Sequence, residues 1–362
     1  MTNGVKTQDV TFEIFHTISP LKEIWVDFDV LSLQLIEDGK KKPIEYSFYQ
    51  SYAWNEFVEE YYKQHSSRFK RLDYILMKVD GEPKAILPLR VTLFPKRKIE
   101  MTSWRTAGIC NAVSPWNVAG HENVFKSLIG FMTERYKGYE IRLFDMPVET
   151  SFVKALAELP GAKESLRDSY HIPLKDFENF DAYYLSLSKK LRHNIQTRSN
   201  HFTHGDLRWE LKIYDKNNPP TEKQWLSIWR IFYYRKLQWN KKASNFFRRI
   251  VCEWEARREV KSGMKVASFN ALDEARLFVY EINGEPAAFV FCYVADGYIV
   301  VPKLAIDMRF RTHAPGILML KEIMKWCYDN GIKDFDLCRG EEPYKQQMGG
   351  IPSQLSRVKI KN

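Results

Sequence analysis

The sequence predicts a mixed α/β protein of two tandem, similar halves, each a mostly antiparallel sheet flanked by helices. The chain has 362 residues, of which 44% are hydrophobic, and this is enough for two cores. A strand–turn–strand pattern occurs twice along the chain, and a helix–glycine–strand pattern follows it both times. We therefore expect one half over residues 1–165 and the other over residues 166–362.

The strand–turn–strand pattern covers residues 79–86 in the first half and residues 282–289 in the second. In both copies an Asp or Asn and a glycine separate two apolar runs, and Glu-Pro follows the glycine. An Asx-Gly pair between two strands predicts a tight β-hairpin. Gly81 and Gly284 are 284 − 81 = 203 positions apart.

The second repeated pattern is an amphipathic helix that ends just before a glycine and leads into a strand. A glycine past the last helical residue suits the left-handed conformation that commonly ends a helix. The two copies are helix 124–137, Gly138 and strand 139–145, then helix 317–330, Gly331 and strand 332–337. Since both patterns recur in the same order at nearly the same spacing, we infer an internal duplication.

The join between the halves, residues 168–181, is short and contains a predicted strand at residues 170–174. Three further helices are predicted from apolar residues at helical spacing, over residues 180–202, 221–235 and 245–260. Helices and strands therefore alternate in both halves, as in mixed α/β proteins.

The net charge of +10 favours a polyanionic partner: nucleic acid, a phosphate-rich cofactor such as coenzyme A, or an anionic membrane face. The five cysteines include no C-x-x-C pair, which predicts reduced thiols in a cytoplasmic protein. His201 and His204 lack a third ligand at a convincing spacing, so no metal is expected. Neither a signal peptide in residues 1–10 nor a membrane span is expected.

The first segment that suits chemistry is the loop before the helix at 317–330. It contains Arg311, Ala314, Pro315 and Gly316, with Ile317 as the next residue. Backbone N–H groups at a helix start bind phosphate, because the unpaired donors and the helix dipole both favour an anion. The alternative is an ordinary helix start.

The second segment follows the strand at 332–337. It contains Asp336, Arg339, Glu341, Tyr344 and Lys345. A loop at a strand end that combines acids, bases and a phenol commonly carries reactive groups. The alternative is a solvated turn with Tyr344 packed on the core.

The third segment is a basic helix face within residues 187–198. Lys189, Lys190, Arg192 and Arg198 lie opposite an apolar stripe. Such a face suits a phosphate or an anionic acceptor, and it is also what a solvated helix surface looks like.

Four pieces of the second half together resemble the acetyltransferase domain of the CelD/BcsL type, a branch of the GNAT superfamily associated with bacterial exopolysaccharide and cellulose loci. They are residues 280–288, 314–316, 335–337 and 339–345; residues 48–54 and 187–198 also look like this family. The tandem layout is similar, more distantly, to the Fem-type aminoacyltransferases, which build peptidoglycan cross-bridges from aminoacyl-tRNA.

The resemblance implies two tandem GNAT-like domains and an N-acyltransferase that moves an acyl group from acetyl-CoA or another acyl-CoA to an amine. The implied acceptor is a small-molecule or glycan amine, such as an amino sugar of a cell-surface polysaccharide precursor. The family's phosphate loop reads Arg/Gln-x-x-Gly-x-Gly/Ala. Arg311, Ala314 and Gly316 hold these places, so one glycine is replaced by alanine. The first half has no comparable loop and is expected to lack the cofactor.

The resemblance also suggests roles for single residues. Asp336, Glu341 or Glu342 would accept the amine proton, and Tyr344 would donate to the departing thiolate. Backbone N–H groups of Lys303, Leu304 and Ala305 would hold the carbonyl oxygen of the thioester. The residues expected to bind phosphate or acceptor are Lys345, Arg339, Arg192 and Lys190.

Two other functions remain open at this stage. The first is aminoacyl-tRNA-dependent transfer of the Fem type, which the fold and the positive charge also allow. The second is a catalytically inactive GNAT scaffold in polysaccharide synthesis.

Overall fold

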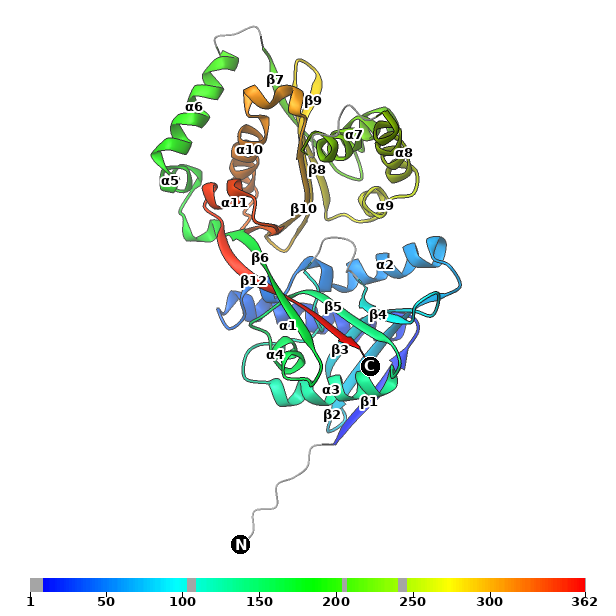
Figure 1. Ribbon diagram of the computed structural model, residues 1–362. Helices are drawn as coiled ribbons and strands as arrows, with labels where there is room; N and C mark the ends of the chain where they lie inside the picture. Colours follow the sequence, from blue (N-terminus) through cyan, green and yellow to red (C-terminus); the bar gives the residue numbers. More distant parts are fainter. Residues whose placement is uncertain (1–8, 103–108, 204–206, 240–245, 362) are drawn as a thin grey trace. The chain divides into compact units, whose positions relative to one another are not determined.

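The computed structural model describes residues 9–102, 109–203, 207–239 and 246–361 (Figure 1). The chain forms two compact units: Met1–Ser169 with Ser353–Asn362 make unit 1, and Tyr170–Pro352 make unit 2. The sequence-based division gave the last ten residues to the second half, and here the structure differs. These residues belong to unit 1 because strand β12 (Ile351–Lys361) pairs with β5 (Glu140–Pro147).

Unit 1 has helices on both faces of a mixed sheet with strand order β1-β2-β3-β4-β5-β12. All its strand pairs are antiparallel except β4–β5, which is parallel because α3 connects the two strands. Its other elements are β1 (Val10–Phe15), α1 (Lys22–Glu37), α2 (Tyr52–His65), β2 (Lys70–Val79), β3 (Glu82–Thr92), β4 (Lys98–Met101), α3 (Glu122–Arg135), α4 (Ser151–Ala157) and the first part of β6 (Lys163–Ile172).

Successive side chains of the unit 1 strands point to opposite faces of the sheet, so unit 1 has two hydrophobic cores. Leu72, Tyr74 and Leu76 of β2 pack with α1 and α2 on one face. Ile75 and Met77 point the other way and pack with α3 and α4. Since successive side chains of a strand point to opposite faces, one strand serves both helical layers.

Unit 2 repeats this plan with strand order β6-β11-β10-β9-β8-β7. Here the parallel pair is β10–β11, joined through α10. Its elements are the end of β6, α5 (Phe180–Ser186), α6 (Lys189–Thr203), β7 (Trp209–Tyr214), α7 (Glu222–Trp239), α8 (Phe246–Ser262), α9 (Met264–Ala271), β8 (Ala275–Ile282), β9 (Glu285–Ala295), β10 (Tyr298–Ile306), α10 (Pro315–Asp329), β11 (Asp334–Arg339) and α11 (Pro343–Gln347). The predicted fold class, a mostly antiparallel mixed sheet flanked by helices, is therefore confirmed.

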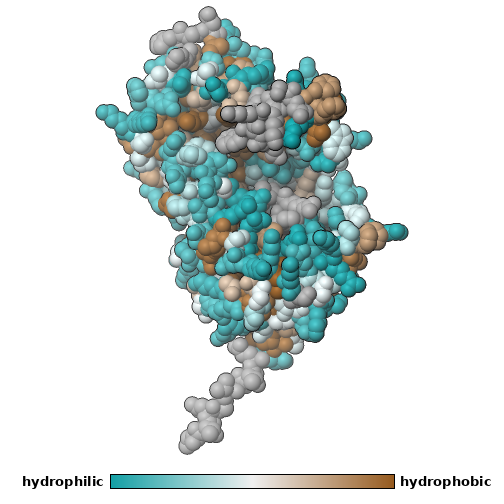
Figure 2. Space-filling view, in the orientation of Figure 1, coloured by the Kyte–Doolittle hydropathy of each residue, from teal (hydrophilic) through white to brown (hydrophobic). Residues whose placement is uncertain are grey.

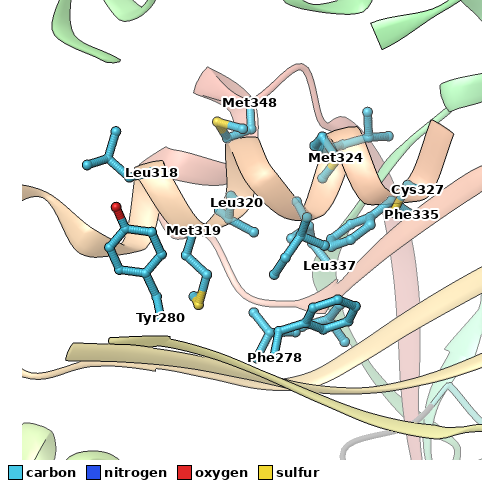
Figure 3. Packing of buried hydrophobic residues seen from close by; sticks show 14 of the residues in the cluster. Phe278, Tyr280, Leu318, Met319, Leu320, Met324, Cys327, Phe335, Leu337 and Met348 are labelled. Carbon is cyan, nitrogen blue, oxygen red and sulfur yellow. The ribbon is translucent and has the colours of Figure 1, made fainter. Parts of the chain in front are cut away.

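The main core of unit 2 lies between α10 and the sheet. Met319 and Cys327 are fully buried on the inner side of α10, against Phe278 and Phe335 of the strands (Figure 3). Helices α5 and α6 add side chains to the same cluster. On the opposite face α7 and α9 pack through aromatic contacts, such as Trp229 on Phe289. The sheet is thus covered on both faces (Figure 1).

The two predicted hairpins are confirmed, and their turns have the same backbone conformation and the same pair of hydrogen bonds. Asp80 and Asn283 are both left-handed, with φ of 51°, and a glycine follows each. The Asp80 N–H donates to the Asp9 carbonyl (2.7 Å), and the Asp80 side chain accepts from the Asp9 N–H (3.0 Å). Asn283 makes the same two bonds with Arg208 (2.8 Å each). Each turn therefore also holds the neighbouring edge strand.

The predicted helix over residues 180–202 is instead two helices, α5 and α6. Leu187 between them is extended, with φ of −65° and ψ of 152°. Ser188 then begins the second helix, because its hydroxyl accepts from the Leu191 N–H (3.2 Å). The break was not predicted, because the apolar residues continue at helical spacing across Leu187.

Candidate active site

Strands β10 and β11 of unit 2 pair over only three residues each. The register pairs are Tyr298 with Asp334, Ile299 with Phe335 and Val300 with Asp336. Beyond Val300, β10 has a bulge and continues beside β9 alone. Two parallel strands that part in this way leave backbone groups without a ladder partner, which a ligand can use.

Asp336 lies at the point where the strands part. Its neighbours Phe335 and Leu337 belong to the core beneath α10, so the Asp336 side chain projects from the opposite face of β11. Burial raises the pKa of Asp336 to about 7, and the nearby charge of Asp334 adds to this. The Cys338 N–H, which donates to the carboxylate (2.6 Å), opposes the shift but does not cancel it. A half-buried carboxylate of this pKa is a competent proton acceptor near neutral pH.

A histidine that sequence analysis missed stands next to this carboxylate. His171 of β6 places Nδ1 2.8 Å from Oδ2 of the buried Asp334. Burial lowers the pKa of His171, but the hydrogen bond and charge of Asp334 outweigh it, so the net pKa is raised. The signal was present in the sequence: His171 lies between the core residues Tyr170 and Ile172, so it must face the other way.

Unit 1 offers a comparison at the corresponding register positions. There β4 and β5 pair over Lys98–Glu100 and Glu140–Arg142, and the residues in place of Asp334 and Asp336 are Glu140 and Arg142. These two form an ion pair (Oε2 to Nη2, 2.6 Å). Unit 1 therefore neutralises charge at this position, whereas unit 2 places two carboxylates on the same face of one strand.

The end of β11 has a left-handed residue, and α11 has a buried lysine. Cys338 is buried and has φ of 55°, a conformation that costs energy in a residue with a side chain. Lys345 is 2% exposed, and its Nζ donates to the carbonyl oxygens of Cys338 (3.0 Å) and Arg339 (2.8 Å). The expectation that Lys345 binds phosphate or acceptor is wrong on this geometry, because its ammonium group holds the loop.

Tyr344 of α11 packs against the core cluster beneath α10, together with Leu304 and Ile317. Burial, together with the charge of Glu342, raises the pKa of its phenol, while Arg235 acts in the opposite direction. Asp336 and Tyr344 both interact electrostatically with Cys338 between them. Asp336 thus projects away from the core beneath α10, whereas Tyr344 packs against that core.

The start of α10 has the form of the predicted phosphate loop. Ala314 is left-handed (φ 50°, ψ 46°), and Pro315 is the first helical residue. A side chain at Gly316 would place its Cβ 2.9 Å from Ile306 Cγ2, so the glycine allows the helix to approach β10. Arg311, in the 3-10 turn Met308–His313 before the helix, is exposed. Arg and helix N–H donors are the groups that bind phosphate best.

The predicted carbonyl-binding segment, Lys303 to Ala305, lies on β10 beyond the bulge. The Leu304 carbonyl accepts from Arg235 of α7 (3.1 Å), a second residue that sequence analysis missed. Lys303 places its ammonium 4.5 Å from the centre of the Phe232 ring. This segment therefore faces both α7 and the α10 side of unit 2.

The remaining predicted residues differ in their positions. Arg339 is half-buried near Lys265 of α9, whose pKa is lowered by burial and by that charge, and Glu341 is exposed. Lys190 and Arg192 lie on α6; Lys190 is exposed, and Arg192 donates to the Leu187 carbonyl (3.1 Å).

In unit 2, a cavity of about 570 Å³ lies between α7, α8 and the ends of β9 and β10. Arg230, Arg309 and Tyr234 are among its lining residues. Within the described ranges, no three His, Cys, Asp or Glu side chains are grouped as metal ligands.

In unit 1 the chain itself occupies the place where β4 and β5 part. The Cys110 N–H donates to the Asp145 carbonyl on β5 (3.1 Å), and Val113 exchanges two backbone bonds with Ile86 of β3 (2.9 and 2.8 Å). Residues 109–114 are all buried. The opening that unit 2 keeps is thus filled by backbone in unit 1.

Comparison with known proteins agrees with this geometry. Residues 237–346, which contain β10, α10, β11 and most of α11, match the family model of the acetyltransferase (GNAT) domain. No curated protein matches the chain.

Solved structures show the same fold over nearly the whole chain. FemX is similar with a TM-score of 0.52 and 12% identity, covering 95% of this chain and 96% of FemX. A tandem GNAT protein from the clavulanic acid biosynthesis pathway also has a TM-score of 0.52, with 10% identity, covering 97% of this chain and 98% of its own. A conserved protein of unknown function from Bacteroides thetaiotaomicron has the same score and identity, covering 97% and 100%. The fold is therefore a tandem GNAT layout.

Proposed function

We propose that the chain is an N-acyltransferase whose unit 2 transfers an acyl group from acyl-CoA to an amine. The observation that carries the proposal is the position of Asp336, with a pKa of about 7, where β10 and β11 part. A thioester lying between the parted strands would meet an amine on the face from which Asp336 projects. The GNAT match over residues 237–346 supports this class of reaction.

Asp336 would act as the general base. An alkylammonium has a pKa of ~10.4, so an amine needs a proton acceptor before it can attack a thioester carbonyl. The amine nitrogen bonds to the carbonyl carbon, the carbon–sulfur bond breaks, and the amine proton passes to the Asp336 carboxylate. A base with a pKa of about 7 is stronger than an ordinary carboxylate, and about half of it is ionised at neutral pH.

Tyr344 would act at the sulfur. Its raised pKa keeps the phenol protonated at neutral pH, so it can donate a hydrogen bond to the departing thiolate. Arg235, which lowers this pKa, favours transfer of the proton as sulfur gains charge.

The start of α10, with Gly316 and the exposed Arg311, would bind the pyrophosphate of coenzyme A. Unit 1 would bind no cofactor, because the segment around Cys110 fills the corresponding opening. We place the reaction in the cytoplasm, and this agrees with five buried cysteines that form no disulfide.

The acceptor we propose is an amino sugar of a cell-surface polysaccharide precursor, on the strength of the sequence resemblance to CelD/BcsL-type domains. The alternative donor is an aminoacyl-tRNA, as in Fem-type enzymes. The similarity in fold to FemX is compatible with this alternative. A salt-sensitive shift of tRNA by the protein, without binding of acetyl-CoA, would favour the alternative.

The test is mass spectrometry of the native protein for bound CoA or acyl-CoA, followed by a thiol-release screen with acetyl-CoA against amino sugars. Arg311→Gln is expected to weaken CoA binding about tenfold, the loss of one charge-assisted bond. Arg309→Gln is the matched control, since Arg309 already pairs with Asp307 (2.8 Å) and Glu285 (3.2 Å). Equal affinity in wild type and Arg311→Gln would remove this loop from the proposal.

A further inference from the structure

Helix α8 of unit 2 exposes an unusual number of large apolar side chains. The exposed fractions are 69% for Phe246, 78% for Phe247, 51% for Ile250, 53% for Val251 and 56% for Trp254. Exposed apolar residues scattered singly are normal, but five within nine positions of one helix form a patch. Figure 2 shows hydrophobic surface at this part of unit 2, among strongly hydrophilic residues.

The five side chains lie on the outward side of the helix. Cys252 and Ala256 are buried and so mark the side of α8 that faces unit 2. At 100° per residue, Trp254 points directly away from these two, and Phe247 and Ile250 lie close beside it. The apolar surface is therefore turned to solvent.

The charged residues of α8 also differ between the two sides of the helix. Arg257, Arg258 and Lys261 are exposed and continue the outward side towards the end of the helix. Of the three acidic residues of α8, Glu253 is bound by Arg230 of α7 (Oε1 to Nη2, 2.6 Å) and by Arg257 (2.9 Å), and Glu259 lies 3.4 Å from the Tyr233 hydroxyl. The third, Glu255, is half-buried on a flank of the helix. The middle of the outward side, around Trp254, thus combines apolar residues with Arg258 and Lys261, and the carboxylates lie away from it.

We propose that this outward side, called here the α8 face, docks the protein on the surface of an anionic lipid bilayer. The α8 face consists of Phe246, Phe247, Ile250, Val251, Trp254, Arg257, Arg258 and Lys261. A helix with aromatic and aliphatic residues on one side and flanking cations lies in the membrane interface, with its apolar side chains at the headgroup boundary. The cations are attracted to anionic headgroups, and the net charge of +10 acts in the same direction.

Charge also argues against the other occupants of such a face. A second copy of the chain would bring the same cations, and Glu253, the carboxylate beside Arg257, is already paired with Arg230 and Arg257. The Arg258 guanidinium lies 4.7 Å from the Trp254 ring centre, an arrangement that keeps cation and ring together at an interface. In this proposal the helix lies on the membrane surface and does not cross the bilayer. No helix in the described ranges is long and apolar enough to span a membrane.

The test is co-sedimentation of the full chain with vesicles of phosphatidylcholine alone and with vesicles of phosphatidylcholine and phosphatidylglycerol in equal parts. We expect binding to the anionic vesicles and little to the neutral ones. Because each removes one large apolar contact, Phe247→Ser and Trp254→Ser are each expected to weaken binding about tenfold or more. Arg258→Gln with Lys261→Gln should weaken it and flatten its salt dependence.

Leu185→Gln is the matched control, since Leu185 of α5 is 63% exposed and lies outside the α8 face. It should bind as wild type does. All variants are first compared with wild type by circular dichroism and thermal unfolding, which separates misfolding from lost binding. Absence of vesicle binding by wild type, or equal binding by Phe247→Ser, overturns the proposal. So does a wild-type dimer that Phe247→Ser turns into a monomer, since the face would then be a contact between copies.

Discussion

Nδ1 of His171 lies 2.8 Å from Oδ2 of Asp334, so the histidine neutralises one of two carboxylates on the same face of β11. The other carboxylate, that of Asp336, interacts with His171 through charge alone, and this charge lowers the pKa of Asp336. Burial is the main cause of the raised pKa of Asp336; the charge of Asp334 adds to it, and the charge of His171 opposes it.

The pH dependence of the reaction should follow this arrangement. If Asp336 is the base, the rate rises with pH through about 7, where its carboxyl loses the proton. Asp334→Asn removes a charge that raises the pKa of Asp336, so the acidic limb should move to lower pH. His171→Gln removes a charge that lowers this pKa, so the limb should move to higher pH. The measurement is kcat/KM against pH for both variants; shifts in the same direction, or none, would contradict the electrostatic account.

The same pKa predicts how stability changes with pH. Asp336 binds a proton more tightly in the folded protein than in the unfolded chain, where a carboxyl has a pKa of ~3.9. Its contribution to the free energy of unfolding is therefore complete below the unfolded value and is lost as pH rises through about 7. Asp336→Asn should remove this fall, as measured by urea unfolding at several pH values. A fall of equal size in the variant would assign it to other groups.

Replacing Tyr344 by Phe deletes one hydroxyl and keeps the ring in its packing. If the phenol assists the departing sulfur, kcat should fall ~10²–10⁴-fold, the usual range for general acid–base catalysis. CoA affinity should change little, because the start of α10 is untouched. The measurement is kcat with the best amine found; a value near wild type would leave Tyr344 as a packing residue only.

Lys345 should matter for stability more than for substrate affinity. Lys345→Met keeps the length of the side chain but leaves the carbonyl oxygens of Cys338 and Arg339 without their donor. Unsatisfied buried acceptors of this kind cost ~1–3 kcal/mol, so the free energy of unfolding should fall by about that amount. Lys325→Met, at an exposed position of α10, is the control and should unfold as wild type does. A lowered CoA affinity with unchanged stability would restore the phosphate-binding role.

Much of the fold could be predicted because its signals are local. The Asn283-Gly284 turn and the glycine after each helix fix conformation through single residues, and both hairpins formed as expected. The pairing of β12 with β5 could not be predicted, because it depends on backbone bonds between residues far apart in the chain.

The candidate site was predicted in part, for the same reason. Asp336, Tyr344 and the loop before α10 could be proposed from the sequence because they lie at or near a strand end or a helix start, and their roles stay predictions. Lys345 was misassigned because a lysine in a polar loop is normally solvated, and its burial depends on the left-handed turn at Cys338. Arg235 was missed because nothing in the sequence of α7 indicates that its guanidinium bonds the Leu304 carbonyl of β10.

The most direct test of the central claim, that unit 2 transfers acyl groups with Asp336 as the base, is thiol release from acetyl-CoA by Asp336→Asn. Asparagine keeps the shape of the side chain but cannot accept the amine proton. With a saturating amine, we predict that kcat falls ~10²–10⁴-fold, and that the rise in rate through about pH 7 disappears. Turnover equal to wild type, with the same rise through about pH 7, would contradict the account.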